Sequence, residues 1–203
     1  MKKRLMICLL VFTMLLSYPL TCFADELSVF YSDEDQIGYD PVRTLYSRLY
    51  DGFTSSEFST YLSQATTQWS NAGISAYGVD SVADSTIEVY GGTRATLEDI
   101  EPDLVNYTAL TSLVDYSYVG DHTYSGRTIA NYEIMKSIIY SPKHPSYYLF
   151  TSSKYKRQFT HELSHALGWL GHSLNSSDVM YSSADSSVYT LTTRDKSHLV
   201  QNY

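Results

Sequence analysis

The stretch THELSHALGWLGHS (residues 160–173) holds three histidines and a glutamate in a spacing that suits a metal ion. His161 and His165 are four residues apart, so on a helix both side chains project from one face and can bind the same ion. Two imidazoles plus a third ligand are typical of zinc, which then keeps one position open for water. Glu162 can reach that water and take its proton. The stretch therefore predicts a single zinc centre with a general base.

The residues after the second histidine supply the candidates for the third ligand. Gly168 is placed to end the helix and turn the chain back, and His172 follows that turn. Gly171 lies between them, and the backbone freedom of glycine allows the chain to bring His172 to the metal. Asp178 is the alternative third ligand. No glutamate follows Glu162, which excludes a glutamate in this position.

Three longer helices are predicted, one of which contains the first two histidines. Apolar side chains at Leu163, Ala166 and Leu167 occupy the other faces of the first helix, which we expect to run from about 153 to 167. A second helix is expected at 54–72, because Thr54 and Glu57 have the spacing of a capping box and Gly73 stands at the other end. The third helix lies at the end of the chain, after residue 191.

The remaining segments are interpreted mainly as strands. Strand-like stretches lie at 37–46, 74–79, 85–90 and 128–141, and in the third of these Ile87 and Val89 alternate inward with Thr86 and Glu88 outward. Residues 108–114 are interpreted as a short helix and 115–126 as a loop. The expected fold class is α+β, with a twisted mixed β-sheet, two long helices and a C-terminal helix.

The first 24 residues have the pattern of a signal peptide. A basic start (Met1–Arg4) precedes an apolar run (Leu5–Leu20), and small residues near Ala24 offer a cleavage site. We therefore expect a secreted, extracellular protein with one catalytic domain at 36–203. A short acidic arm at 25–35 precedes this domain and is a candidate mini-propeptide. Both cysteines leave with the leader, so the mature chain has no disulfide.

The charge balance limits the partners that the protein can bind. Loss of the basic leader leaves 11 basic against 22 acidic residues, a net charge near −11. Such a surface argues against nucleic acid and against an anionic membrane as a partner. The mature chain has no second apolar run long enough to anchor it in a membrane. We expect a monomer whose partner is a protein or peptide substrate.

Residues 160–181 resemble the metzincin metallopeptidases and, within them, the matrixins. That family's motif is His-Glu-x-x-His-x-x-Gly-x-x-His followed by a turn with a methionine, and the turn here is Asp178–Tyr181, with Met180 in the methionine position. The resemblance implies a bacterial-type, minimal secreted zinc endopeptidase whose cleft lies between the sheet with its helices and a smaller C-terminal part. It also implies that Met180 packs beneath the metal ligands, and that the substrate adds as a strand to an exposed sheet edge. Tyr181–Ser183 would then line the pocket for the residue after the scissile bond.

The chain departs from the family pattern in several places. One extra residue separates Gly168 from His172, and no histidine-rich loop accompanies His122, so no structural zinc is expected. His122, His144 and His198 are interpreted as surface histidines. A cysteine latch is impossible in the mature chain, so inhibition would need a carboxylate of the acidic arm, such as Asp25, Glu26 or Asp33. Calcium binding is left open, and the alternative function is a secreted zinc-binding or adhesive module that cleaves nothing.

Overall fold

The computed structural model describes residues 36–203 except 125–126, 146–149 and 184–185. The expected signal peptide (1–24) and acidic arm (25–35) lie outside the described residues. Within the described ranges, no helix is both long enough and apolar enough to cross a membrane.

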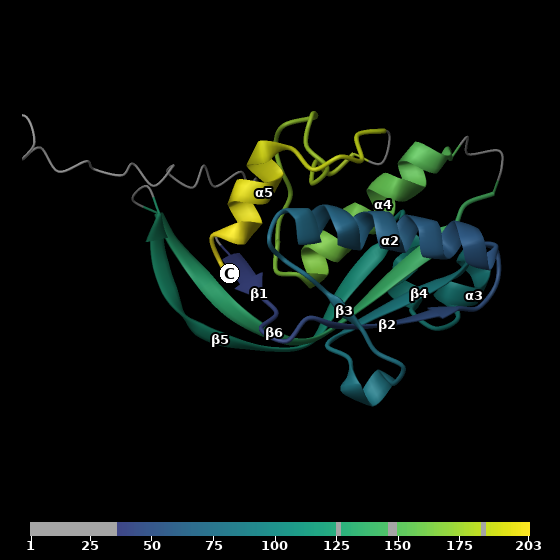
Figure 1. The fold of residues 1–203 in the computed structure, drawn as a ribbon, viewed down its shortest axis with the longest axis horizontal. Helices are drawn as coiled ribbons and strands as arrows, with labels where there is room; N and C mark the ends of the chain where they lie inside the picture. Colours follow the sequence, from purple (N-terminus) through teal and green to yellow (C-terminus); the bar gives the residue numbers. More distant parts are fainter. Residues whose placement is uncertain (1–35, 125–126, 146–149, 184–185) are drawn as a thin grey trace, which may run out of the picture.

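In this part of the chain six strands form one sheet, in the order β1-β6-β4-β2-β3, with β5 paired to β6. Neighbouring strands are parallel, apart from β5 and β6, which are antiparallel. The β5–β6 hairpin is long and curves beyond the rest of the sheet, on the side of β1 and α5 (Figure 1). The strands are β1 (Gln36–Tyr39), β2 (Thr44–Leu49), β3 (Tyr77–Gly78), β4 (Ile87–Thr93), β5 (Leu110–Tyr124) and β6 (Arg127–Lys143).

Two long helices, α2 (Ser55–Asn71) and α4 (Ser152–Ala166), lie together on one face of the sheet (Figure 1). Both were predicted from the sequence, within one residue at each end. The capping box of α2 is present: the Glu57 amide donates to Thr54 Oγ1 over 3.1 Å, and the Thr54 amide donates to the Glu57 carboxylate over 2.8 Å. The shorter elements are η1 (Val82–Asp84), α3 (Arg94–Glu98), η2 (Pro102–Asn106) and α5 (Thr193–Val200).

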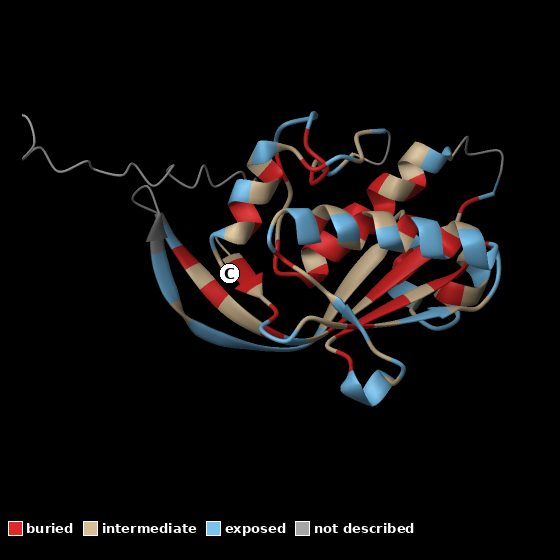
Figure 2. Ribbon diagram, in the orientation of Figure 1, coloured by how far each residue is buried: buried red, intermediate tan, exposed pale blue. Residues whose placement is uncertain are grey.

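The main core lies between these two helices and the sheet (Figure 2). The apolar stripes of the helices are buried against each other and against β4 and β6, as the helical spacing of the stripe in α2 predicts. Aromatic rings fill the contact, with Phe58 and Phe159 centroids 5.6 Å apart. The core includes Phe58, Tyr61, Ala65 and Trp69 of α2, Tyr155, Phe159 and Leu163 of α4, and Ile87, Val89 and Ile139 of the sheet. The predicted α+β class is therefore compatible with the observed combination of helices and one mostly parallel sheet.

The interpretation of residues 108–114 as a short helix and of 115–126 as a loop is wrong where the structure describes it, because Leu110–Tyr124 forms strand β5. Residues 125–126 lie outside the described residues. The register against β6 shifts between Leu113 and Asp115, between Asp115 and Tyr116, and between Tyr118 and Gly120. Each shift inserts an irregularity that interrupts the two-residue alternation of a regular strand. The sequence pattern that would have predicted a strand is therefore absent, although the backbone pairs along almost the whole length of β6.

Two details of the strand predictions also change. The expected strand 37–46 divides into β1 and β2, because the Asp40 carboxylate accepts hydrogen bonds from the amides of Val42 (2.9 Å) and Arg43 (2.8 Å) and holds a turn between them. Glu88 does not face solvent: its side chain is buried and forms an ion pair of 2.6 Å with Lys136.

Candidate metal centre

The end of α4 turns the chain back over the helix face that carries His161 and His165. Gly168 has a φ of 115°, its amide donates to the His165 carbonyl over 3.0 Å, and the Trp169 amide donates to the Ser164 carbonyl over 3.0 Å. This pair of hydrogen bonds is the Schellman motif, in which glycine takes the left-handed position. A Cβ atom at Gly168 would lie 1.9 Å from the carbonyl oxygen of Gly38 in β1. Only glycine therefore allows this turn to pack on β1.

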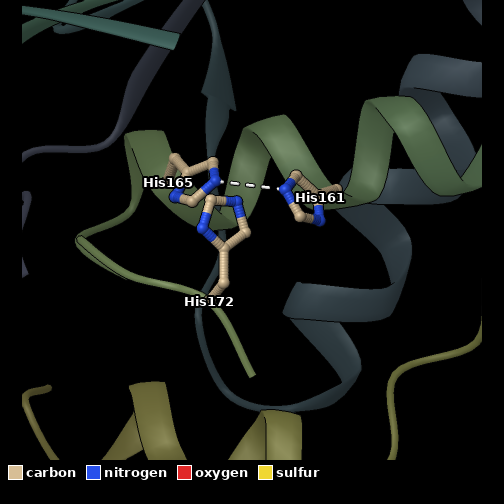
Figure 3. Close-up of side chains that lie close together, drawn as sticks. All are labelled: His161, His165 and His172. Atoms are coloured by element: carbon tan, nitrogen blue, oxygen red, sulfur yellow. Dashed lines mark hydrogen bonds between the residues drawn. The ribbon is translucent and has the colours of Figure 1, made fainter. Parts of the chain in front are cut away.

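The turn brings His172 to the two histidines of the helix. Figure 3 shows the three rings converging, His161 and His165 from α4 and His172 from the chain that follows it. The ring centroids are 4.8 Å (His161 to His165), 5.2 Å (His161 to His172) and 5.0 Å (His165 to His172) apart. One nitrogen from each ring lies within 4.8 Å of the others. The three imidazoles could therefore hold one metal ion.

Hydrogen bonds on the far side of the rings define which nitrogens face this point. Nδ1 of His161 lies 2.9 Å from the Val179 carbonyl oxygen, and Nδ1 of His165 lies 2.6 Å from the Trp169 carbonyl oxygen. Because a carbonyl only accepts, Nδ1 must carry the proton and Nε2 the lone pair. The two Nε2 atoms are 3.2 Å apart. Two nitrogens bound tetrahedrally to one zinc ion would be about 3.3 Å apart, so this donor set fits zinc.

Burial keeps all three imidazoles neutral at ordinary pH. It is the largest cause that lowers the pKa of His161 and of His172, and it lowers the pKa of His165 to about 3. The electrostatic effects of His165, Arg157 and His172 lower the pKa of His161 further. Neutral imidazoles are the form that binds a metal, so protons compete with the ion only under acid conditions.

Glu162 lies beside this cluster, with its side chain buried against strand β5. Thr111 Oγ1 of β5 donates to the Glu162 carboxylate over 2.7 Å and lies 3.0 Å from the carbonyl oxygen of the same residue. Burial raises the pKa of Glu162 to about 7, against the opposing effects of Thr111 and of the Arg157 charge. A carboxyl group with a pKa near neutrality can both accept and return a proton.

The segment expected to form the turn with the methionine packs directly behind His161. Val179 supplies the carbonyl that accepts from His161, and the Asp195 carboxylate accepts from the amides of Val179 (3.1 Å) and Met180 (3.4 Å). Met180 is fully buried in the main core. Asp195 belongs to the first turn of α5, so the C-terminal helix holds the backbone that orients a histidine.

Asp178, the alternative third ligand, has other partners. Its carboxylate forms hydrogen bonds with Arg194, at 2.7 Å from Nε and 2.8 Å from Nη2, and with the hydroxyls of Thr192 (2.8 Å) and Ser173. These bonds use both oxygens of a fully buried carboxylate. Asp178 therefore fixes the loop that carries His172 and does not belong to the histidine cluster.

A cleft of about 660 Å³ opens over the three histidines and Glu162. One wall is the start of β5 with the residues before it, and the floor is the cleft-facing side of α4. Of the segment 181–183, Ser182 alone is among the described residues that line the cleft. Further lining residues are Gln36, Tyr107, Thr108, Ala109, Leu110, Thr111, Leu113, Tyr116, Tyr132, Phe150, Lys154, Arg157, Gln158 and Leu170.

Two of the three histidines interpreted as surface residues are buried. His144 stacks on Phe150 with ring centroids 4.2 Å apart, and His198 packs on Trp169 at 4.1 Å. Both belong to the packing around the cleft, and sequence spacing gives no sign of such contacts. His122 is exposed on β5, with its Nε2 atom 3.1 Å from the Asn131 side chain.

Sequence reasoning missed two residues that line the cleft beside the catalytic candidates. Thr111 had no detectable signal, because the segment around it was interpreted as a helix. Arg157 had one: it precedes His161 by four residues and so shares its helix face.

Comparison of the chain with protein-family models and with curated proteins finds no match.

Proposed function

We propose that the chain is a secreted zinc-dependent endopeptidase of the metzincin type. The observation that carries the proposal is the convergence of three neutral imidazoles, two with their Nδ1 protons directed to backbone carbonyls, next to a buried glutamate in an open cleft. His161, His165 and His172 would hold the zinc ion, which would supply Lewis-acid chemistry there by acidifying water and polarising a carbonyl oxygen.

In this proposal Glu162 moves the protons of the reaction. Its carboxylate takes a proton from the attacking water and delivers it to the nitrogen of the departing amine. Thr111 holds one carboxylate oxygen over 2.7 Å and so fixes the side chain in one orientation. The pKa of Glu162, about 7 through burial, suits a group that must accept and donate within one cycle.

The surroundings of the two third-ligand candidates support His172. Its ring already lies 5.0 Å from the ring of His165, whereas Asp178 is neutralised by Arg194. Moving Asp178 to the metal would break its hydrogen bonds with Arg194, Thr192 and Ser173, which is costly for a buried carboxylate. Met180 then serves as packing behind the ligands, in the role that the resemblance implies.

The substrate is proposed to bind as an extended strand along β5. Among the described residues β5 pairs with β6 alone, so its second edge offers unpaired backbone groups beside the cleft. An extended peptide can add to such an edge through main-chain hydrogen bonds. Leu110, Thr111 and Leu113 of β5 line the same cleft as Glu162 and the three histidines, so an added strand would pass beside the histidines.

A peptide-library digest tests this function. The mature, zinc-loaded protein should cleave peptides within their sequence, and Glu162→Gln should reduce the rate about 10²- to 10⁴-fold while it retains zinc. Equal cleavage by the two proteins would contradict the role of Glu162. Zinc binding without cleavage by either protein would favour the non-catalytic binding module.

A further inference from the structure

Arg157 is a buried cation in the cleft that the reaction proposed above does not use. It lies on α4 one turn before His161, lines the cleft, and is only 6% exposed. Its Nη2 atom donates to the carbonyl oxygen of Tyr181, and its Nε atom is buried without any hydrogen-bond partner. A buried guanidinium normally has an anion and most of its five donors satisfied.

The described residues provide no ion pair for this guanidinium. Glu162 and Asp195 act on Arg157 only through their charges at longer range, and burial, the larger effect, lowers its pKa. By contrast, Arg194 uses two nitrogens to bind the Asp178 carboxylate. The chain thus pairs one arginine near the site completely and leaves the arginine inside the cleft with a single carbonyl.

The charges in the cleft add to this imbalance. A divalent ion on the three histidines would bring two further positive charges. Glu162 is the one acidic side chain among the described lining residues. An occupied site is therefore strongly positive around Arg157, although the whole chain is acidic. A bound carboxylate would offset this charge in a region of low dielectric constant, where such pairs are strong.

We propose that Arg157 is a specificity-determining residue that binds a substrate carboxylate next to the scissile bond. The inference rests on the proposed peptidase function. Arg157 contacts Tyr181, and Ser182 lines the same cleft. The resemblance implies that this segment lines the pocket for the residue after the scissile bond, so we place the carboxylate on that residue. The carboxylate has two possible sources: an aspartate or glutamate side chain within a longer peptide, or the C-terminal carboxylate of a peptide that ends at that residue.

Peptides that carry one fluorophore at the N-terminus and differ at the position after the scissile bond test the proposal, with cleavage followed by liquid chromatography. One set carries Glu, the isosteric Gln or Leu there within a long peptide, and a second set ends at a Leu with either a free or an amidated C-terminus. Wild type should cleave the Glu peptide, or the free C-terminus, at least about 10-fold faster in kcat/KM than its neutral counterpart. The pair that shows the preference identifies the source of the carboxylate.

Variants at position 157 separate charge recognition from a purely structural role. Arg157→Gln should bring the ratio of kcat/KM for the charged and the neutral peptide, both measured with the same variant, close to one, and Arg157→Lys should retain part of the preference. Lys156→Gln is the matched control, because it removes the same charge from α4 at a residue whose ammonium lies 5.0 Å from the ring of Tyr189 and does not line the cleft. It should keep the preference.

Absence of any preference in wild type, or a preference unchanged in Arg157→Gln, would overturn the inference while Glu162-dependent cleavage still stands. If wild type cleaves none of the peptides, binding of the same peptides to the zinc-loaded Glu162→Gln protein, measured by fluorescence anisotropy, decides it. Carboxylate recognition is supported if this protein binds the Glu peptide more tightly than the Gln peptide, or the free C-terminus more tightly than the amidated one. The difference in affinity should disappear in the double variant that also carries Arg157→Gln. Equal affinities contradict carboxylate recognition.

Discussion

At the scale of single residues, replacing His172 should affect zinc binding, whereas replacing Asp178 should affect stability. His172→Ala removes one of three converging imidazoles, so zinc content should fall from about one per chain to a small fraction after dialysis. Asp178→Asn leaves the three imidazoles in place and should retain zinc. It should lower the free energy of unfolding by about 2 kcal/mol, because Arg194 loses its charged partner.

Atomic emission measures the zinc content of each variant, and urea denaturation measures its stability. The opposite result would assign the third ligand to Asp178. In that case Asp178→Asn would lose zinc while it is still folded, and His172→Ala would retain zinc.

The residues of the site were predictable from sequence where their spacing is short. His161, Glu162 and His165 lie within two turns of one helix, and Gly168 gives a reason for His172 to return to them. Thr111, which is 51 positions from Glu162, reaches it only because β5 packs beside α4. Long-range contacts of this kind depend on the whole fold, and one sequence contains no local signal for them.

At the scale of elements, the turn after α4 depends on a single glycine. Gly168→Ala would place a methyl group 1.9 Å from the Gly38 carbonyl oxygen and would strain a φ of 115°. It should lower the free energy of unfolding by at least about 3 kcal/mol. It should also weaken zinc binding, because this turn delivers His172.

Gly78→Ala is the matched control for this turn. No heavy atom lies within 4 Å of a Cβ at Gly78, so the change should alter stability by less than about 0.5 kcal/mol. Urea denaturation of both variants measures the difference. Similar stabilities for the two variants would show that the turn tolerates a side chain.

The helices were predicted better than the strands because their sequence signals are local. Helix α2 carries its signals locally, in the Thr54–Glu57 capping box and the stripe ending at Trp69. Strand β5 is defined by pairing with β6, and its register shifts remove the alternation that marks a strand in sequence. Its exposed aromatic residues, such as Tyr116 and Tyr118, further hide the distinction between core and surface.

At the scale of the whole molecule, buried histidines should make the metal-free protein sensitive to acid. Burial lowers the pKa of His198 to about 3, whereas an unfolded histidine titrates near its ordinary value of 6.5. Between these values the unfolded chain binds more protons than the folded chain, so stability is complete above pH 6.5 and decreases as the pH falls. The slope is about 1.4 kcal/mol per pH unit for each such group.

Urea denaturation of the metal-free protein between pH 7 and 4 tests this sign. His198→Gln should show a shallower loss of stability over that range, whatever its stability at pH 7. Parallel curves for wild type and His198→Gln would show that His198 does not contribute.

A zinc titration of the metal-free protein tests the proposed zinc centre most directly. Cleavage of one peptide from the library is followed during the titration. Cleavage should be absent at the start, rise in proportion to added zinc, and reach its plateau at about one zinc per chain. Glu162→Gln should bind the same amount of zinc and stay almost inactive throughout. Cleavage by the metal-free protein, or an equal plateau for Glu162→Gln, would contradict a three-histidine zinc centre with Glu162 as its base.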